Sequence, residues 1–122
     1  MGISRALKKR GMDVQPWKAG PDYIDPGFHS RAAGRICRNL DTMILSADAV
    51  QEIYQRQECE ISLVEGVMGL FDGAGGLDER GSAAHLAKLL KLPVVVVIDS
   101  KAMARSAGAV ALGFAEFDPD VN

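Results

Sequence analysis

A run of apolar residues near the C-terminal end most constrains the fold of this chain. Residues 92–98 read Leu-Pro-Val-Val-Val-Val-Ile, without one polar side chain. A continuous β-branched run of this kind is typical of a parallel strand that is covered on both faces, and it is too short to cross a bilayer. We therefore expect residues 92–98 to form a buried strand of a parallel sheet.

The remaining segments alternate between strand and helix patterns. Further strands are predicted at residues 12–18 and 61–64. Helices are predicted at residues 1–10, 47–57, 84–90 and 102–116. An alternating order with buried strands predicts an α/β fold with a parallel, doubly wound sheet.

The predicted helices carry apolar residues that mark their inward faces. These residues are Ile3, Ala6 and Leu7, then Val50, Ile53 and Tyr54, then Ala84, Leu86, Ala87, Leu89 and Leu90. Met43, Met68 and Met103 have no ligand spacing, so we expect them to fill the core.

A charged segment rich in proline and glycine follows the first predicted strand and continues to about residue 41. Within it, the stretch 15–29 contains Lys18, Asp22, Tyr23, Asp25 and His29 among three prolines and two glycines. Proline and glycine favour a rigid, irregular path, and the aromatic rings of Trp17, Tyr23 and Phe28 can anchor it to the sheet. We interpret this segment as a functional loop rather than a purely structural turn.

Polar residues stand at the ends of three predicted strands. Lys18 with Asp22, Glu65, and Asp99 with Ser100 occupy these positions. Because ligands bind at the carboxyl ends of the strands in such sheets, we expect all three strand ends to meet at one edge.

A glycine-rich loop at residues 66–81 follows Glu65. A carboxylate directly after a strand can hold Mg²⁺ in nucleotide-using proteins, although it can equally cap a helix or form a salt bridge. The glycines leave backbone amides open to an anion, and Asp72 adds a second carboxylate; the alternative is a flexible excursion without a ligand.

The histidines and cysteines carry weaker signals. His29 could hydrogen-bond a substrate carboxylate, whereas His85 lies in a leucine-rich helix and is expected to be structural. Cys37 and Cys59 lack metal-binding spacing, so we expect reduced, inert thiols and a cytoplasmic protein.

The composition bounds the domain count and the class of partner. The chain has 122 residues, of which 48% are hydrophobic, enough for at most one domain. Its 14 basic and 16 acidic residues are dispersed, which argues against nucleic-acid or membrane partners and favours small-molecule chemistry.

Several long motifs together resemble the cobyrinic acid a,c-diamide synthase family. They are Lys18 followed by Gly-Pro-Asp-Tyr-Ile-Asp-Pro at 20–26 and His29; Arg-Asn-Leu-Asp at 38–41; Val-Glu-Gly-Val-Met-Gly-Leu-Phe-Asp-Gly at 64–73; His-Leu-Ala-Lys-Leu-Leu at 85–90; Met-Ala-Arg-Ser at 103–106; and Gly-Phe-Ala-Glu-Phe-Asp-Pro-Asp at 113–120. The resemblance covers nearly the whole chain. It implies a P-loop NTPase-like fold of the kind found in dethiobiotin synthetase, with residues 1–122 as part of an ATP-dependent synthetase domain.

The resemblance also implies a reaction and a set of site residues. The family activates two corrin-ring carboxylates with ATP and converts the acyl phosphates to amides with ammonia from glutamine. Glu65 and Asp41 would hold Mg²⁺, and Lys18 would face the transferred phosphoryl group. The residues implied on the ring side or at the reacting carboxylate are Asp22, Tyr23, Asp25, His29 and Asp72.

The chain departs from the family pattern in two large respects. The family's glycine-rich phosphate loop and its glutamine amidotransferase domain have no counterpart in this sequence. Smaller departures are Ile36-Cys37, where Pro-Ser is usual, and Ala83, where a hydroxyl residue is common. We therefore expect the chain to be inactive alone and to associate with other copies.

Two alternatives remain open at the level of the sequence. A stand-alone binding module could keep this fold without the nucleotide loop. A related ligase could act on a nickel tetrapyrrole or on a biotin precursor, although the motif at residues 20–26 disfavours the biotin branch.

Overall fold

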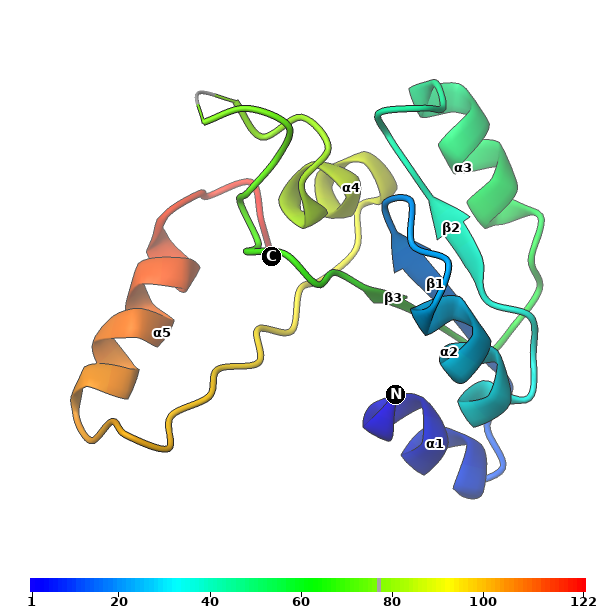
Figure 1. The fold of residues 1–122 in the computed structure, drawn as a ribbon, viewed down its shortest axis with the longest axis horizontal. Coiled ribbons are helices and arrows are strands. Elements are labelled where there is room, and N and C mark those ends of the chain that lie inside the picture. Colours follow the sequence, from blue (N-terminus) through cyan, green and yellow to red (C-terminus); the bar gives the residue numbers. More distant parts are fainter. Residues whose placement is uncertain (77) are drawn as a thin grey trace.

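The computed structural model describes residues 1–76 and 78–122 and shows an α/β fold around a parallel sheet (Figure 1). Strands β1 (Val14–Ala19), β2 (Arg38–Leu40) and β3 (Ile61–Glu65) lie in the order β2-β1-β3, and both neighbouring pairs are parallel. Leu77, inside the predicted glycine-rich loop, lies outside the described residues. The predicted α/β class and the parallel sheet are confirmed.

Helices cover both faces of this sheet. They are α1 (Gly2–Lys9) and α2 (Asp25–Ala33) on one face and α3 (Ala47–Gln55) and α4 (Ala83–Leu90) on the other, while α5 (Ser106–Glu116) lies apart from the sheet (Figure 1). Trp17 of β1 is fully buried in a cluster that includes Val50 of α3 and Leu86 of α4. Lys18, the next residue, points to the opposite face, where it meets Asp25 of α2. The alternation along β1 thus directs Trp17 into the apolar cluster and Lys18 to the opposite face.

The core confirms the inward residues that were predicted for two helices. Val50 of α3 is buried and Ile53 and Tyr54 pack against the same cluster, while α4 contributes Leu86 together with Leu89 and Leu90. Helix α3 begins at Ser46, whose hydroxyl accepts a hydrogen bond from the Ala49 amide. Helix α4 begins in the same way at Ser82, which accepts from the His85 amide.

The charged segment before residue 41 was predicted to be an irregular loop, but it contains the helix α2 and the strand β2. The Oδ1 atom of Asp22 accepts hydrogen bonds from the amides of Ile24 and Asp25, and a proline occupies the first turn of α2. Gly34 ends the helix with a left-handed φ of 74°. Proline at the start and a left-handed glycine at the end are ordinary helix boundaries, and both were present in the sequence.

The prediction of a buried strand at residues 92–98 is wrong. These residues belong to no strand of the described chain, and the side chains of Val95 and Val97 are 79% and 83% exposed. A strand forms only where a neighbour supplies hydrogen-bond partners, and among the described residues β3 pairs on one side only, with β1. In Figure 1 the segment runs in yellow away from β3 toward α5.

Several smaller expectations are also wrong. In α1 the buried side chain is Ser4, whereas Ile3 and Ala6 are exposed. Met43, Met68 and Met103 are exposed instead of filling the core, since they lie in segments outside the helices and strands. The last helix begins at Ser106, four residues later than predicted.

In the described part of the chain, no helix combines the length and the apolar character that crossing a membrane requires.

Candidate functional site

Lys18 is the centre of a polar cluster at the carboxyl end of β1. The side chain is only 2% exposed, although lysine is almost never buried without partners. The parallel register sets Lys18 opposite Glu65 of β3 on one side and Asn39 of β2 on the other. The ends of β1 and β3 therefore meet as the sequence predicted.

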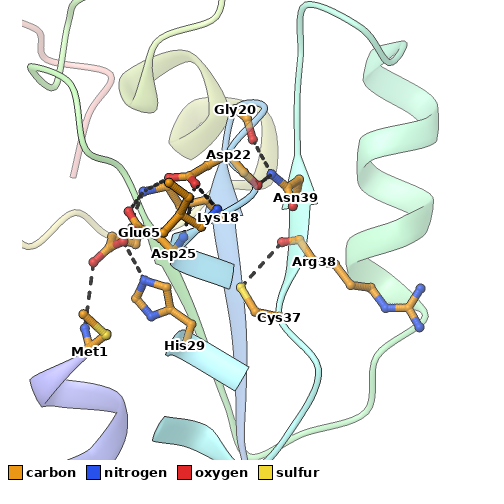
Figure 2. A network of polar contacts seen from close by, with 11 residues as sticks. Met1, Lys18, Gly20, Asp22, Asp25, His29, Cys37, Arg38, Asn39 and Glu65 are labelled. Atoms are coloured by element: carbon orange, nitrogen blue, oxygen red, sulfur yellow. Dashed lines mark hydrogen bonds and ion pairs between the residues drawn. The ribbon is translucent and has the colours of Figure 1, made fainter. Parts of the chain in front are cut away.

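Three carboxylates surround the Lys18 ammonium group (Figure 2). Lys18 Nζ lies 2.9 Å from Asp25 Oδ2 and 3.2 Å from both Asp22 Oδ2 and Glu65 Oε2. A lysine ammonium has three N–H donors, so these contacts occupy all of them. A phosphoryl group could contact Lys18 only if one carboxylate gave up its place.

These contacts shift the pKa values of the ionisable groups in the cluster. Burial opposes the charged form of Lys18, but its hydrogen bonds to Asp25, Glu65 and Asp22 outweigh burial and raise its pKa. Burial likewise disfavours the Glu65 carboxylate, but hydrogen bonds from His29 and Lys18 lower its pKa. For Asp22, the hydrogen bond from the Ile24 amide is the main cause that lowers the pKa to about 2. The lowered pKa values keep the Asp22 and Glu65 carboxylates ionised at neutral pH.

His29 of α2 joins the cluster through Glu65. Its ring is buried, and Nε2 lies 2.6 Å from Glu65 Oε2, the same oxygen that contacts Lys18. The other oxygen, Oε1, lies 3.8 Å from the amino group of Met1. His29 was predicted to contact a substrate carboxylate, but in this arrangement its partner is a carboxylate of the protein.

Asn39 is a positioning residue that the sequence prediction did not single out. Its side-chain amide donates to the carbonyl oxygens of Gly20 and Asp22, at 2.8 Å each. The Gly20 amide in turn donates to the Leu40 carbonyl at 2.9 Å. These bonds tie the loop that carries Asp22 to β2. Asn39 belongs to the motif at residues 38–41, and that motif is the sequence feature that could have identified it.

Asp41, predicted to bind a metal, follows β2 and is 6% exposed. Its Oδ1 atom accepts hydrogen bonds from the amides of Met43 and Ile44, whereas Oδ2 is buried without a hydrogen-bond partner among the described residues. A buried, unpartnered carboxylate oxygen is the type of ligand that Mg²⁺ takes. The described residues contain no group of three or more His, Cys, Asp or Glu side chains that could hold a metal ion by themselves.

Other predicted residues lie outside the Lys18 cluster. Asp72 is exposed in the loop after β3, and its amide donates to the Gly69 carbonyl. Tyr23 is 94% exposed, so like the half-exposed Phe28 it does not anchor the loop to the sheet. Asp99 is exposed and accepts a hydrogen bond from the Lys101 amide. The third strand end therefore does not converge with the other two, because residues 92–98 leave the sheet.

The other histidine and the cysteines have the structural roles expected of them. The Nδ1 atom of His85 accepts a hydrogen bond from the Gly81 amide at 3.2 Å, which fixes the entry to α4. Cys37 and Cys59 are free. Burial is the main cause that raises the pKa of the Cys37 thiol to about 11, and so it is an unreactive thiol at neutral pH.

Comparison with known proteins shows extensive similarity to one group of enzymes. The chain is 48% identical over 98% of its length to hydrogenobyrinate a,c-diamide synthase of Streptomyces coelicolor, of which it covers 25%. It is 46% identical over 99% of its length to cobyrinate a,c-diamide synthase of Archaeoglobus fulgidus, of which it covers 27%. The synthase of the same name from Picrophilus torridus is 49% identical over 97% of the chain, which covers 27% of that protein.

Over this segment, the chain is a homologue of the cobyrinate a,c-diamide synthases. It spans about a quarter of the length of the curated synthases that it matches. No family model matches the chain, and no solved structure matches it. The segment shared with the synthases contains the whole Lys18 cluster, since the match covers nearly all of the chain.

Proposed function

We propose that this chain supplies part of the synthetase domain of an amide synthase that amidates the a and c carboxylates of cobyrinate or a closely related corrinoid. The domain would be P-loop NTPase-like, and the donors would be ATP and ammonia from glutamine. The relatives are named for corrinoid substrates, which favours a corrin over a nickel tetrapyrrole or a biotin precursor.

The observation that carries this proposal is the buried Lys18 with three carboxylates at the carboxyl ends of two parallel strands. Buried ionic groups are expensive, and clusters of them at strand ends in α/β sheets mark ligand sites. The cluster has more negative than positive charge, so it suits cationic groups better than it suits an anionic substrate. Ammonia that becomes ammonium, or a divalent metal ion, has the required charge.

The residues present offer Mg²⁺ two candidate carboxylate ligands. Asp41 offers an unpartnered buried oxygen, and Glu65 is the second candidate carboxylate. Mg²⁺ commonly takes only one or two protein carboxylates and completes its shell with phosphate oxygens and water. When bound, the ion would offset the negative charge of the phosphoryl oxygens.

The chain's own residues would prepare the reacting groups. Asp25 and Glu65 hold the Lys18 ammonium at the strand ends, so a phosphoryl group that displaced one carboxylate would meet a positive charge already in place. Asn39 and the backbone bonds of Asp22 keep the loop rigid, which favours the orientation of a bound carboxylate. Tyr23 is exposed and free to contact a large ring. Asp72 would reach the reacting carboxylate from the loop after β3.

The test replaces Glu65 in a full-length synthase that contains this sequence. Glu65→Gln keeps the shape but removes the charge that Lys18 and His29 share, so we expect kcat to fall by about 10² or more. Asp22→Asn, on the ring side, should raise the KM for the corrinoid or stall the second amidation more than it changes the KM for ATP. Steady-state kinetics and the yield of mono-amidated product measure both effects.

Glu58→Gln is the matched control, because the same change of charge is made at an exposed position. It should leave kcat and both KM values unchanged. Melting temperatures of all variants separate loss of chemistry from loss of folded protein. Near-normal turnover of Glu65→Gln would show that the cluster is structural and that the proposed site is wrong.

A further inference from the structure

Ile24 and Phe28, at the start of α2, form a short exposed apolar stripe. Ile24 and Phe28 are 72% and 55% exposed. Positions 24, 28, 31 and 32 follow the spacing of one helix face. Exposed apolar side chains are common on protein surfaces, so the stripe points to a ligand only together with the hollow and the charges beside it.

The stripe leads into a hollow between α2 and α1. Phe28, Arg31 and Ala32 of α2 and Arg5 of α1 line a space of about 420 Å³. The two helices lie beside each other in the lower part of Figure 1. The hollow thus combines one aromatic ring with two guanidinium groups, which is a lining suited to an oxyanion on a planar or apolar body.

Neither arginine is neutralised within the described chain. Arg5 and Arg31 have no ion pair or side-chain hydrogen bond there, whereas Arg35 pairs with Asp13 and Arg56 with Glu52. Lys8, Lys9 and Arg10 follow Arg5, and the first ten residues contain no acidic side chain. In a chain with a formal net charge of −2, this corner is a local concentration of positive charge that favours an anionic ligand.

Helix α2 connects the hollow to the acidic cluster. Asp25 and His29 lie four residues apart and contact Lys18 and Glu65, while Phe28 and Arg31 line the hollow. Asp25 and Arg31 are separated by about 9 Å along the helix axis, at 1.5 Å per residue. A tetrapyrrole-sized ring with carboxylate arms can span that separation.

We propose that Arg5, Arg31 and Phe28 form an anchoring site for carboxylate arms of the corrinoid other than those being amidated. This inference rests on the proposed function, and it explains how an acidic cluster can serve an acidic substrate. The two arginines bind the arms through charge-assisted hydrogen bonds, and the Phe28 ring packs against the apolar edge of the macrocycle. The reacting carboxylate is then held over the strand ends by contacts made outside the acidic cluster.

The test measures binding of cobyrinate to the chain by equilibrium dialysis, with the visible absorbance of the corrin as the readout. Arg5→Gln and Arg31→Gln should each raise Kd about tenfold, the factor expected for one lost charge-assisted hydrogen bond, and the double variant should lose more. Phe28→Leu should weaken binding less. Arg56→Gln removes the same charge on α3 and should leave Kd unchanged, and circular dichroism confirms that each variant is folded.

The other outcomes separate this inference from the proposed function. Equal cobyrinate binding by the wild-type chain and the double variant would overturn the anchoring site and leave the proposed amidation standing. Absence of cobyrinate binding by the folded wild-type chain would also overturn it. Inorganic tripolyphosphate is the second probe: if it binds the hollow more tightly than cobyrinate and depends on the same arginines, the site is a phosphate site. Loss of turnover in Glu65→Gln is measured separately and does not depend on the hollow.

Discussion

At the scale of single residues, the position of Lys18 depends on its charged partners. An ammonium group taken out of water is costly unless it is paired, and Asp22, Asp25 and Glu65 provide that pairing. The same carboxylates would repel one another without Lys18, since one oxygen of each lies within 3.2 Å of a single nitrogen atom. Stability and the electrostatics of the site therefore depend on the same contacts.

Asp22 gives a prediction about pH. Its folded-state pKa is lowered from an ordinary value of 3.8 to about 2. A lowered carboxyl pKa contributes stability that is present above the unfolded value and is lost as pH falls through the folded value. We expect Asp22→Asn to be less stable than the wild type at neutral pH, and the difference to shrink between about pH 4 and pH 2.

Urea denaturation of both proteins across this pH range measures the effect. Asp48→Asn, at an exposed position in the first turn of α3, is the control at another helix start. A difference between Asp22→Asn and wild type that stays constant down to pH 2 would mean that the shifted pKa does not contribute to folding.

At the scale of elements, α2 is the helix that connects the sheet to both proposed ligand surfaces. Its start is fixed by Asp22 and a proline, and its end by Gly34 in the left-handed conformation. The Ser30 hydroxyl inside the helix donates to the Pro26 carbonyl and accepts from the Cys37 amide, which leads the chain into β2. The helix is therefore tied by hydrogen bonds to the loop before it and to the segment that leads into β2.

Two glycines of this segment give a matched pair of variants. Gly34→Ala places a side chain at a φ of 74°, and its Cβ would lie 3.4 Å from Lys8 Cε, so we expect a loss of about 1 kcal/mol. Gly27→Ala lies inside α2 with open space around the new methyl group, so we expect a neutral effect or a gain of up to about 1 kcal/mol. Chemical denaturation measures both, and equal effects of the two substitutions would contradict this account of the helix end.

At the scale of the whole molecule, the part after α4 is held by few contacts. Lys88 of α4 bonds to Glu79 at 2.6 Å and to Asp118 at 2.8 Å, and the Phe71 ring packs against Phe117 with a centroid distance of 4.6 Å. Helix α5 has no fully buried residue among those described. Residues 92–98 expose apolar side chains, and among the described residues β3 has a side without a strand partner, which exposes backbone hydrogen-bonding groups. Such edges favour pairing with other chains.

We therefore expect the chain to associate in solution through residues 92–98. The double variant Val95→Lys/Val97→Lys should shift the chain toward the monomer. Charged side chains on an exposed, extended segment oppose its pairing with a strand of another copy. Sedimentation velocity at tens of micromolar measures the distribution, and Ile44→Lys, at another exposed apolar position, is the control for added charge. A wild-type chain that stays monomeric under these conditions would exclude this association.

The sequence alone determined the α/β class of the fold and the meeting of two strand ends. Periodicity predicted six elements, α1, α3, α4, α5, β1 and β3, with errors of up to four residues at their ends, because burial on one face leaves a repeating apolar pattern. It missed α2 and β2, and it placed a strand at residues 92–98 where none forms. The meeting of Lys18 and Glu65 also followed from sequence, because the carboxyl ends of parallel strands lie at the same edge of a sheet and both residues were predicted to end such strands. The family resemblance was carried by long contiguous motifs, and sequence comparison bears it out.

Only the tertiary structure decided which residues have partners. The β-branched run at 92–98 has strand propensity, but a strand also needs a neighbour, and no local pattern reports whether one is present. The role of Asn39, the engagement of all three Lys18 donors and the unpartnered Asp41 oxygen depend on contacts between segments far apart in the chain. The hollow beside Phe28 likewise exists only because α1 packs against α2, a proximity that no single stretch of sequence encodes.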